Sequence, residues 1–135
     1  MAPINKPALI RAAARARKSA VAPYSKFLVG AALLTKRGEI ITGANVESAS
    51  YGLTCCAERV ALFKALTDGK KDFVAVAVVT RAANGAMPCG ACRQLLAEYA
   101  SAATVLVADS MALKKIRQFS VAELLPGAFR GEMLR

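Results

Sequence analysis

The chain has 135 residues, of which 56% are hydrophobic, and a formal net charge of +10 at pH 7. This composition excludes a disordered chain, and no apolar run approaches the roughly 18 residues that a membrane-spanning helix requires. The length is typical of one domain that buries its own core without disulfides, so we predict a single domain over residues 1–135.

The periodicity of the apolar residues predicts helices and strands in the order α-β-β-α-β-α-β-β. The predicted helices are 7–20, 54–67 and 88–99, and the predicted strands are 27–35, 39–46, 73–80, 103–108 and 114–120. We therefore predict an α/β fold, a three-layer α/β/α sandwich with a mixed five-stranded sheet. Parallel strands joined through the second and third helices would bring both helix starts to one edge of the sheet, where α/β proteins bind ligands.

Basic residues concentrate in the first predicted helix, and no acidic residue precedes Glu39. An Arg-rich, acid-free start is typical of a mitochondrial transit peptide, and a basic stripe is typical of a nucleic-acid surface. We favour a third interpretation, a solvent-exposed helix face. Arg11, Arg15 and Lys18 share one side of the predicted helix, and Leu9 lies with alanines on the other.

The four cysteines form two close pairs, Cys55-Cys56 and Cys89-x-x-Cys92, which is not the spacing of a disulfide framework. Thiolate–metal chemistry in a reducing compartment fits this pattern better. Cys89 and Cys92 lie at i and i+3 at a helix start that Pro88 marks, and Cys56 lies near the start of another helix. The sequence therefore predicts three sulfurs at two helix N-termini, with Cys55 as a small core residue.

Three protein ligands leave the fourth position of a tetrahedral zinc open, which is typical of a catalytic site. Water bound there ionises near neutral pH, and in a chain without histidine Glu58 is the expected proton shuttle. We expect Arg59 and Arg93, each close in sequence to a ligand, to offset the thiolate charge by donating to sulfur. The alternatives are a closed structural site that includes Cys55 and a set of buried free cysteines.

The pattern C-x-E at 56–58 followed by P-C-x-x-C at 88–92 is the signature of zinc deaminases. With it, the chain resembles the small, homotetrameric, zinc-dependent cytidine deaminases of nucleoside salvage, within the cytidine/deoxycytidylate deaminase superfamily. The resemblance covers nearly the whole chain, and it implies the cytidine deaminase-like version of the predicted fold. The matching segments are Pro23–Phe27, Val29–Ala32, Gly43–Glu47, Ala49–Gly52, Thr54–Val60, Pro88–Leu95 and Glu123–Phe129.

The resemblance implies a role for each residue of the metal site. Cys56, Cys89 and Cys92 would bind one Zn²⁺ per subunit, and Glu58 would be the general acid and base. Arg59 would neutralise a zinc thiolate.

The resemblance also implies how a nucleoside binds. Asn45 and Glu47 would hold the sugar hydroxyls, Phe27 would pack on the pyrimidine, and the backbone N–H of Ala57 would donate to its O2. Phe129 of a neighbouring subunit would help to close the pocket. As alternatives, Phe27 is a simple core residue and Asn45 a strand-end turn residue, whereas a glutamate in an apolar strand favours the ligand-binding role of Glu47.

The implied activity is the hydrolytic deamination of cytidine and 2′-deoxycytidine to uridine and 2′-deoxyuridine, with release of ammonia. The resemblance further implies cytoplasmic pyrimidine salvage by a homotetramer with shared pockets, and neither a membrane nor a nucleic-acid partner. It argues against a cleaved transit peptide, because the Arg-rich stretch coincides with the family's first helix. Three alternatives remain: a deaminase of bases in RNA or DNA, a deaminase of a nucleoside antibiotic, and a non-catalytic zinc domain that binds nucleic acid. The pair Asn45-x-Glu47 argues against the first two, and Glu58 argues against the third.

Overall fold

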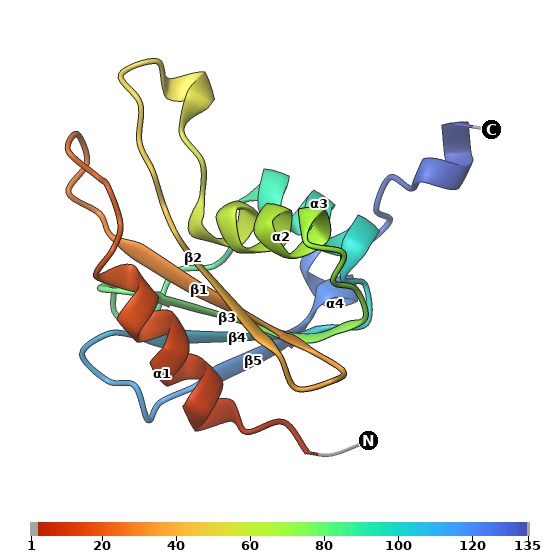
Figure 1. The fold of residues 1–135 in the computed structure, drawn as a ribbon, viewed down its shortest axis with the longest axis horizontal. Helices are drawn as coiled ribbons and strands as arrows, with labels where there is room; N and C mark the ends of the chain where they lie inside the picture. Colours follow the sequence, from red (N-terminus) through yellow and green to blue (C-terminus); the bar gives the residue numbers. More distant parts are fainter. Residues whose placement is uncertain (1–2, 135) are drawn as a thin grey trace.

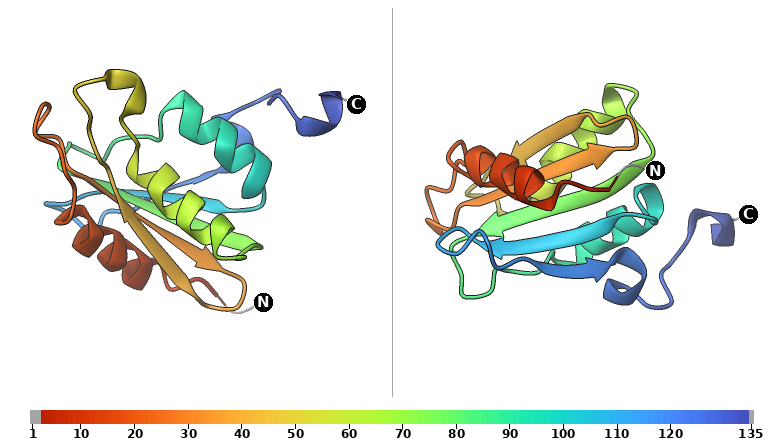
Figure 2. Two further views of the ribbon diagram at one scale, coloured as in Figure 1. Left: turned by 45° about the horizontal axis from the view of Figure 1, so that its top comes forward. Right: turned by 90° about the horizontal axis from the view of Figure 1, so that it is seen from below.

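The structure is a computed structural model that describes residues 3–134, so the predicted domain limits 1 and 135 lie outside the described residues. A five-stranded sheet has α1 on one face and α2 and α3 on the other (Figures 1 and 2), which confirms the predicted three-layer α/β fold. The helices and strands are α1 (Lys6–Arg17), β1 (Val29–Thr35), β2 (Ile40–Ala44), α2 (Ala57–Thr67), β3 (Phe73–Thr80), α3 (Gly90–Tyr99), β4 (Thr104–Asp109), β5 (Arg117–Ser120) and α4 (Val121–Leu124).

The sheet has the strand order β2-β1-β3-β4-β5 and is mixed, as predicted. β1 pairs antiparallel with both β2 and β3, whereas β3 and β4 are parallel, with Thr80 opposite Asp109. β2, β3 and β4 therefore run in the same direction and end at the same edge of the sheet. Because α2 follows β2 and α3 follows β3, both helices begin at that edge, as the sequence predicted.

The first helix is amphipathic in the way that the sequence indicated. Leu9 and Ile10 are buried against the sheet, whereas Arg11, Arg15 and Lys18 are exposed. The side chain of Asn5 caps the helix by accepting the N–H of Ala8 at 3.1 Å. The basic residues of α1 therefore form an exposed helix face, and the helix ends at Arg17, three residues before the predicted end.

Two glycines allow the helices to approach the sheet closely. A Cβ at Gly30 would lie 2.0 Å from the carbonyl oxygen of Ala13 in α1. A Cβ at Gly43 would lie 2.5 Å from the backbone nitrogen of Ala61 and 2.6 Å from the carbonyl oxygen of Ala57, both in α2. Backbone atoms cannot give way as side chains do, so only glycine fits these two contacts.

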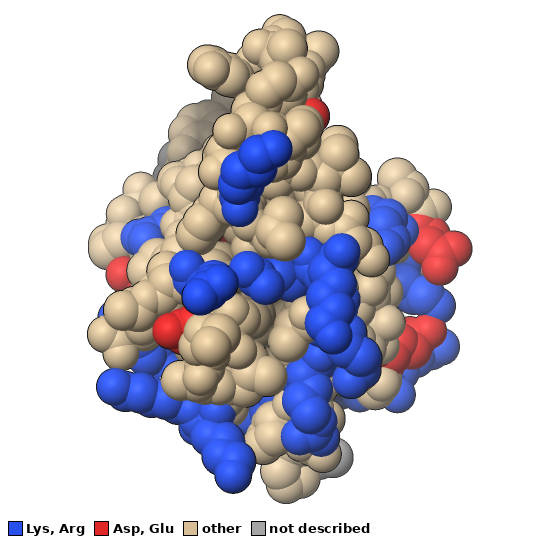
Figure 3. Space-filling model, turned by 90° about the vertical axis from the view of Figure 1, so that its left-hand side faces the viewer, with Lys and Arg blue, Asp and Glu red and all other residues tan. Residues whose placement is uncertain are grey.

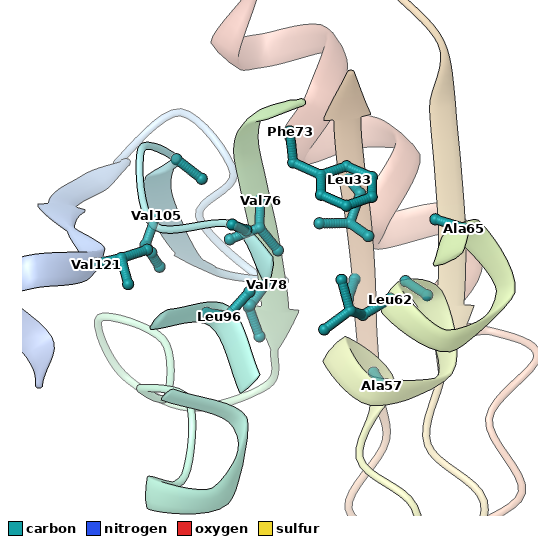
Figure 4. Packing of buried hydrophobic residues seen from close by; sticks show 14 of the residues in the cluster. Leu33, Ala57, Leu62, Ala65, Phe73, Val76, Val78, Leu96, Val105 and Val121 are labelled. Atoms are coloured by element: carbon teal, nitrogen blue, oxygen red, sulfur yellow. The ribbon is translucent and has the colours of Figure 1, made fainter. Parts of the chain in front are cut away.

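The larger apolar cluster lies between the sheet and the helices α2, α3 and α4 (Figure 4). Leu62 of α2, Leu96 of α3 and Val121 of α4 all contribute to it, packed over Val76 and Val78 of β3. The smaller cluster lies under α1, where small strand residues such as alanine face Leu9 and Ile10. The start of α2 belongs to the larger cluster through the fully buried Ala57.

Several strands are shorter than predicted: β1 begins at Val29 instead of residue 27, β2 covers 40–44 instead of 39–46, and β5 begins at Arg117 instead of residue 114. Three further differences concern α2, α3 and α4. α2 begins at Ala57 instead of residue 54, because a 3₁₀ turn (Tyr51–Leu53) is followed by an extended segment in which Cys55 bridges to Val46. α3 begins at Gly90, so Pro88 precedes the N-cap Cys89 and does not lie in the first helical turn. The short helix α4 was not predicted. Its N-terminus is stabilised by a reciprocal capping box between Ser120, the N-cap, and Glu123.

The basic excess of the sequence is carried on the surface. Figure 3 shows a face on which lysine and arginine side chains far outnumber acidic ones. Within residues 3–134 the ion pairs are Lys70–Glu39 and Arg130–Glu132, so most cations of the described chain face solvent. No helix in this part of the chain is long and apolar enough to cross a membrane.

Candidate metal centre and active site

Three cysteine sulfurs converge where α2 and α3 begin. Cys56 is the N-cap of α2, Cys89 is the N-cap of α3, and Cys92 lies in the first turn of α3. Their Sγ atoms all lie within 4.8 Å of one another, with 3.8 Å between Cys56 and Cys89 and 3.4 Å between Cys89 and Cys92. The structure thus brings together the three residues that the sequence selected as metal ligands.

The geometry of this cluster fits zinc. A tetrahedral zinc with Zn–S bonds of about 2.3 Å separates its sulfur ligands by about 3.8 Å, close to the spacing observed. Cys55 is not part of the group, because its backbone exchanges hydrogen bonds with Val46 at 2.8 and 3.0 Å as a strand bridge. The described chain therefore offers three thiolate ligands, which is the donor set of an open site, and the closed four-cysteine alternative is disfavoured.

Two features favour negative charge on the sulfurs. Cys56 and Cys89 are the N-caps of the two helices, and the helix dipoles place partial positive charge at both helix starts. Arg59 donates from Nη2 to the sulfur of Cys56 at 3.3 Å, as predicted. Hydrogen bonding from the Cys92 thiol, and then from Arg59, lowers the pKa of Cys56. A thiolate is thus stabilised at Cys56 before any metal binds.

Arg93 does not make the contact predicted for it. Its Nε donates to the carbonyl oxygen of Pro88 at 2.8 Å, and its Nη1 donates to that of Leu124 at 3.0 Å. The prediction that Arg93 donates to sulfur is therefore wrong. The sequence could not reveal this, because Leu124 is brought to Arg93 only by the position of α4.

Glu58 lies in the first turn of α2 and is only 6% exposed. Burial raises the pKa of its carboxyl to about 7, and the negative charge of Cys56 contributes to the same shift. A carboxyl with a pKa near neutrality both accepts and returns a proton readily, which suits a general acid and base. Glu58 is thus the one buried acidic side chain of the described residues, and it lies beside the sulfur cluster.

The carboxylate of Glu47 is held by the turn at Tyr24 and Ser25. Its Oε1 accepts the N–H groups of both turn residues at 3.1 Å, and the hydroxyl of Ser25 donates to Oε2. The hydrogen bond from the Ser25 side chain is the main cause that lowers the pKa of Glu47. The Ser25 oxygen also accepts the N–H of Phe27 at 3.0 Å, so one hydroxyl orients both Glu47 and Phe27.

The amide of Asn45 is largely occupied by backbone groups. Its Oδ1 accepts the N–H of Val29 at 2.8 Å, and its Nδ2 donates to the carbonyl of Phe27 at 2.9 Å. One N–H of the amide is left for a ligand. The next residue, Val46, bridges to Cys55, so the segment from Asn45 to Glu47 runs alongside the residues that precede α2. Phe27 belongs to a different segment, before β1, and is joined to this one by the hydrogen bond from Asn45.

Ser25 and Thr80 are supporting residues that the sequence reasoning did not select. Thr80 is 1% exposed, and its hydroxyl accepts the N–H of Ala86, which anchors the loop leading to Cys89. Gly85 of that loop packs flat on β4, where a Cβ would lie 2.5 Å from the side chain of Val107. A serine two residues before an aromatic residue is a weak local signal of a turn, but a threonine ending an apolar strand gives none.

Phe129 lies in a C-terminal segment that projects from the body of the molecule (Figure 1). Its side chain is 52% exposed, and its carbonyl accepts a hydrogen bond from Gln94 Nε2 at 2.9 Å. The segment is thus tied to the first half of α3 through the backbone, while the aromatic ring remains available for another contact.

Comparisons with known proteins agree with this geometry. Residues 4–108 match the family model of the cytidine and deoxycytidylate deaminase zinc-binding region. The chain is 51% identical over 129 residues to a cytidine deaminase of Halalkalibacterium halodurans, covering 96% of this chain and 97% of that protein. It is 36% identical over 110 residues to a blasticidin-S deaminase of Bacillus cereus, with 76% of each protein covered. The crystal structure of a cytidine deaminase from Burkholderia pseudomallei superimposes with a TM-score of 0.86 at 48% identity, over 90% of this chain and 97% of that one.

The family match extends over most of the sheet and over both cysteine-bearing helix starts, and the relatives align with almost the entire chain. The three sulfurs and the buried carboxyl occur within the matched region. On these grounds the chain belongs to the cytidine and deoxycytidylate deaminase family, with a zinc-binding region of that family as its metal centre.

Proposed function

We propose that this protein is a hydrolase that deaminates cytidine and 2′-deoxycytidine to uridine and 2′-deoxyuridine and releases ammonia. The observation that carries the proposal is the carboxyl of Glu58, buried at a helix start beside three converging cysteine sulfurs. Membership of the deaminase family and the similarity to cytidine deaminases along nearly the whole chain support the choice of substrate.

Cys56, Cys89 and Cys92 would hold the zinc ion, one per subunit. When bound there, zinc supplies Lewis-acid activation of the attacking water. Arg59 offsets part of the thiolate charge through its hydrogen bond to Cys56. The helix starts of α2 and α3 stabilise the remaining negative charge.

Glu58 moves the protons of the reaction. Its carboxylate accepts a proton from the attacking water and delivers it to N3 of the pyrimidine while oxygen adds to C4. It then relays the second proton of that water to the amino group, the C4–N bond breaks, and ammonia leaves as C4 becomes a carbonyl. The low exposure of Glu58 and its pKa near 7 suit both directions of transfer.

Phe27, the segment from Asn45 to Glu47 and the first residue of α2 would bind and orient the nucleoside. Asn45 and Glu47 would hold the sugar hydroxyls, with Glu47 pre-oriented by the turn at Tyr24 and Ser25. Phe27, 41% exposed, would pack on the pyrimidine. The N–H of Ala57, in the first turn of α2, would donate to O2 of the base.

The test is the turnover of cytidine by the zinc-loaded protein, followed by ultraviolet absorbance, beside the variants Glu58→Gln and Asp68→Asn. Glu58→Gln should lower kcat by about 10²–10⁴-fold, because the amide cannot carry a proton. Asp68→Asn, at the exposed end of the same helix, should retain wild-type turnover. Turnover of blasticidin S but not of cytidine, or equal activity of wild type and Glu58→Gln, would contradict the proposal.

We infer further that the enzyme is a homotetramer in which Phe129 of one subunit helps to close the pocket of another. Apolar side chains on projecting segments support this: Tyr51 is 82% exposed, Leu53 74% and Phe129 52%. Light scattering should give a mass of four times 14.1 kDa. Phe129→Ala should raise KM, and a monomeric mass would contradict the shared pocket.

We also infer a role in cytoplasmic pyrimidine salvage. The four cysteines are all free thiols, which is typical of a reducing compartment. Free nucleosides are the substrates of salvage, so loss of the protein should leave cells unable to use cytidine as a source of uridine. Growth of a uracil-requiring strain on cytidine, with and without the gene, measures this directly.

A further inference from the structure

Arg93 binds the peptide groups on both sides of the ligand Cys89. Its backbone N–H donates to the carbonyl of Cys89 at 2.9 Å, the first hydrogen bond of α3, which any residue except proline would make. What the arginine adds is its side chain, whose Nε donates to the carbonyl of Pro88 at 2.8 Å. These two carbonyls flank the Cα of Cys89, whose backbone has φ −68° and ψ 167°. One residue therefore restrains the backbone that determines where the Cys89 sulfur points.

Apolar packing holds the preceding residue, Pro88, which is buried, but it does not cover Cys89 itself. Cys89, Gly90 and Ala91 are all exposed, and the buried side chains of α3 begin only at Cys92 and Leu96. Between the buried residues Pro88 and Cys92, the orientation of the Cys89 sulfur therefore depends also on the polar contacts of the backbone around it.

The other end of the Arg93 guanidinium is bound to α4. Nη1 donates at 3.0 Å to the carbonyl of Leu124, in the last turn of that short helix. α4 is anchored by Val121, which is 2% exposed in the main core cluster, and by the capping box of Ser120 and Glu123. The planar guanidinium thus connects the turn at Pro88 and Cys89, called the cysteine turn below, to α4, which is packed into the core. A lysine has a single ammonium group and cannot reproduce this fork.

We propose that Arg93 is a positioning residue of the metal centre, which holds Cys89 in its ligand position by joining the cysteine turn to α4. This inference rests on the proposed zinc site, but it does not depend on which substrate the enzyme uses. It assigns to α4 a part in metal retention, although α4 contributes no ligand.

The first experiment measures the zinc dissociation constant by competition with a chromophoric chelator, for wild type and the variants Arg93→Gln, Arg93→Lys and Arg11→Gln. Loss of a group that orients a metal ligand weakens binding by about 10- to 100-fold, and we expect this for Arg93→Gln. Arg93→Lys should be intermediate, because it keeps the charge and loses one of the two contacts. Arg11→Gln removes the same charge from the exposed face of α1 and should bind zinc as the wild type does.

Two further measurements separate positioning from general instability. Thermal unfolding of the metal-free proteins reports any loss of fold. If Arg93→Gln fails to fold, the zinc dissociation constant and cobalt absorption of Arg93→Lys test the proposal instead. In cobalt-substituted protein, the thiolate-to-cobalt absorption per bound ion should weaken in Arg93→Gln, because Cys89 is displaced. Unchanged zinc affinity and unchanged cobalt absorption in a folded Arg93 variant would overturn the proposal, whatever effect that variant has on cytidine turnover.

The link to α4 has a test of its own. Ser120→Ala removes the N-cap of α4 without touching α3, and it should raise the zinc dissociation constant by about two- to tenfold. In the Arg93→Gln background the same change should add nothing, because the connection is already cut. Gln94→Ala is the matched neighbour: it frees the carbonyl of Phe129 but not the cysteine turn, so zinc affinity should stay unchanged. Additive effects of Ser120→Ala and Arg93→Gln, or weaker zinc binding by Gln94→Ala, would contradict the assignment.

Discussion

The two helix starts that form the metal centre are held by different forces. At the start of α2, Ala57 is fully buried, Glu58 is 6% exposed, and Gly43 of β2 allows the helix to lie directly on the sheet. At the start of α3, Cys89 and Gly90 are exposed (Figure 2 shows both helices on one face of the sheet). Core packing therefore holds the first residues of α2 directly, whereas at α3 it holds Pro88 and Cys92 and leaves the exposed residues between them to hydrogen bonds such as those of Arg93. The carboxyl of Glu58, which we propose as the proton carrier, lies in the closely packed half.

Metal removal should separate the two halves most clearly. After dialysis against a chelator, we expect deamination to fall to background and to return when zinc is added. Hydrogen exchange followed by mass spectrometry should show faster exchange in the turn at 88–93, since Cys89 and Cys92 lose their bonds to zinc, while the core residues of α2 remain protected. Equal loss of protection in both helices would show that α2 also depends on the metal.

A methyl group added at Gly43 of β2, beneath the start of α2, should destabilise the protein far more than one added at Gly90, the first residue of α3. Gly43→Ala pushes a Cβ into the backbone of α2, so we expect a loss of about 1–3 kcal/mol in the free energy of unfolding and a lower kcat, because Glu58 moves with the helix. Gly90→Ala meets no atom within 4 Å and should change stability by less than about 0.5 kcal/mol. Denaturant unfolding of the zinc-loaded variants measures both. A neutral Gly43→Ala would mean that α2 is not held by close packing.

A smaller loss of stability is expected from the loop before α3, which Thr80 anchors through the N–H of Ala86. Thr80→Val keeps the shape of the buried side chain but leaves the N–H of Ala86 without its acceptor, which should cost about 1 kcal/mol of unfolding free energy. Zinc affinity should fall slightly, because this loop leads to Cys89. Thr42→Val on β2 is the control and should alter neither quantity. No change in Thr80→Val would mean that the loop is anchored by other contacts.

The smallest effect concerns Glu47 and Phe27, the proposed nucleoside-binding residues, which lie outside both helices. Ser25→Ala removes the hydroxyl that orients both Glu47 and Phe27, and KM for cytidine should rise about two- to tenfold with little change in kcat. The exposed Ser101→Ala is the matched control. A fall in kcat at unchanged KM would place Ser25 in the chemical step instead of in binding.

Most of the fold was predictable because its elements carry their own local signals. The β-branched run 73–80 is β3 to the residue, and the apolar face of α1 begins at Leu9 as expected. The failures lie where local signals are weak or compete. The segment before α2 extends to Cys56 because Cys55 pairs with Val46, a contact that helical periodicity does not contain. The four residues of α4 are too few to show a period.

The sequence by itself determined which cysteines could share a metal ion and which carboxyl could serve it. The spacing of Cys89 and Cys92 and the position of Glu58 after Cys56 are properties of single helix starts. Only the tertiary structure decided which partner each polar side chain meets: Arg59 donates to sulfur, whereas Arg93 donates to carbonyls of its own turn and of α4, 31 residues away. The physical reason is that a helix start depends on neighbouring residues, whereas a guanidinium binds whichever buried acceptors the folded chain brings within its reach.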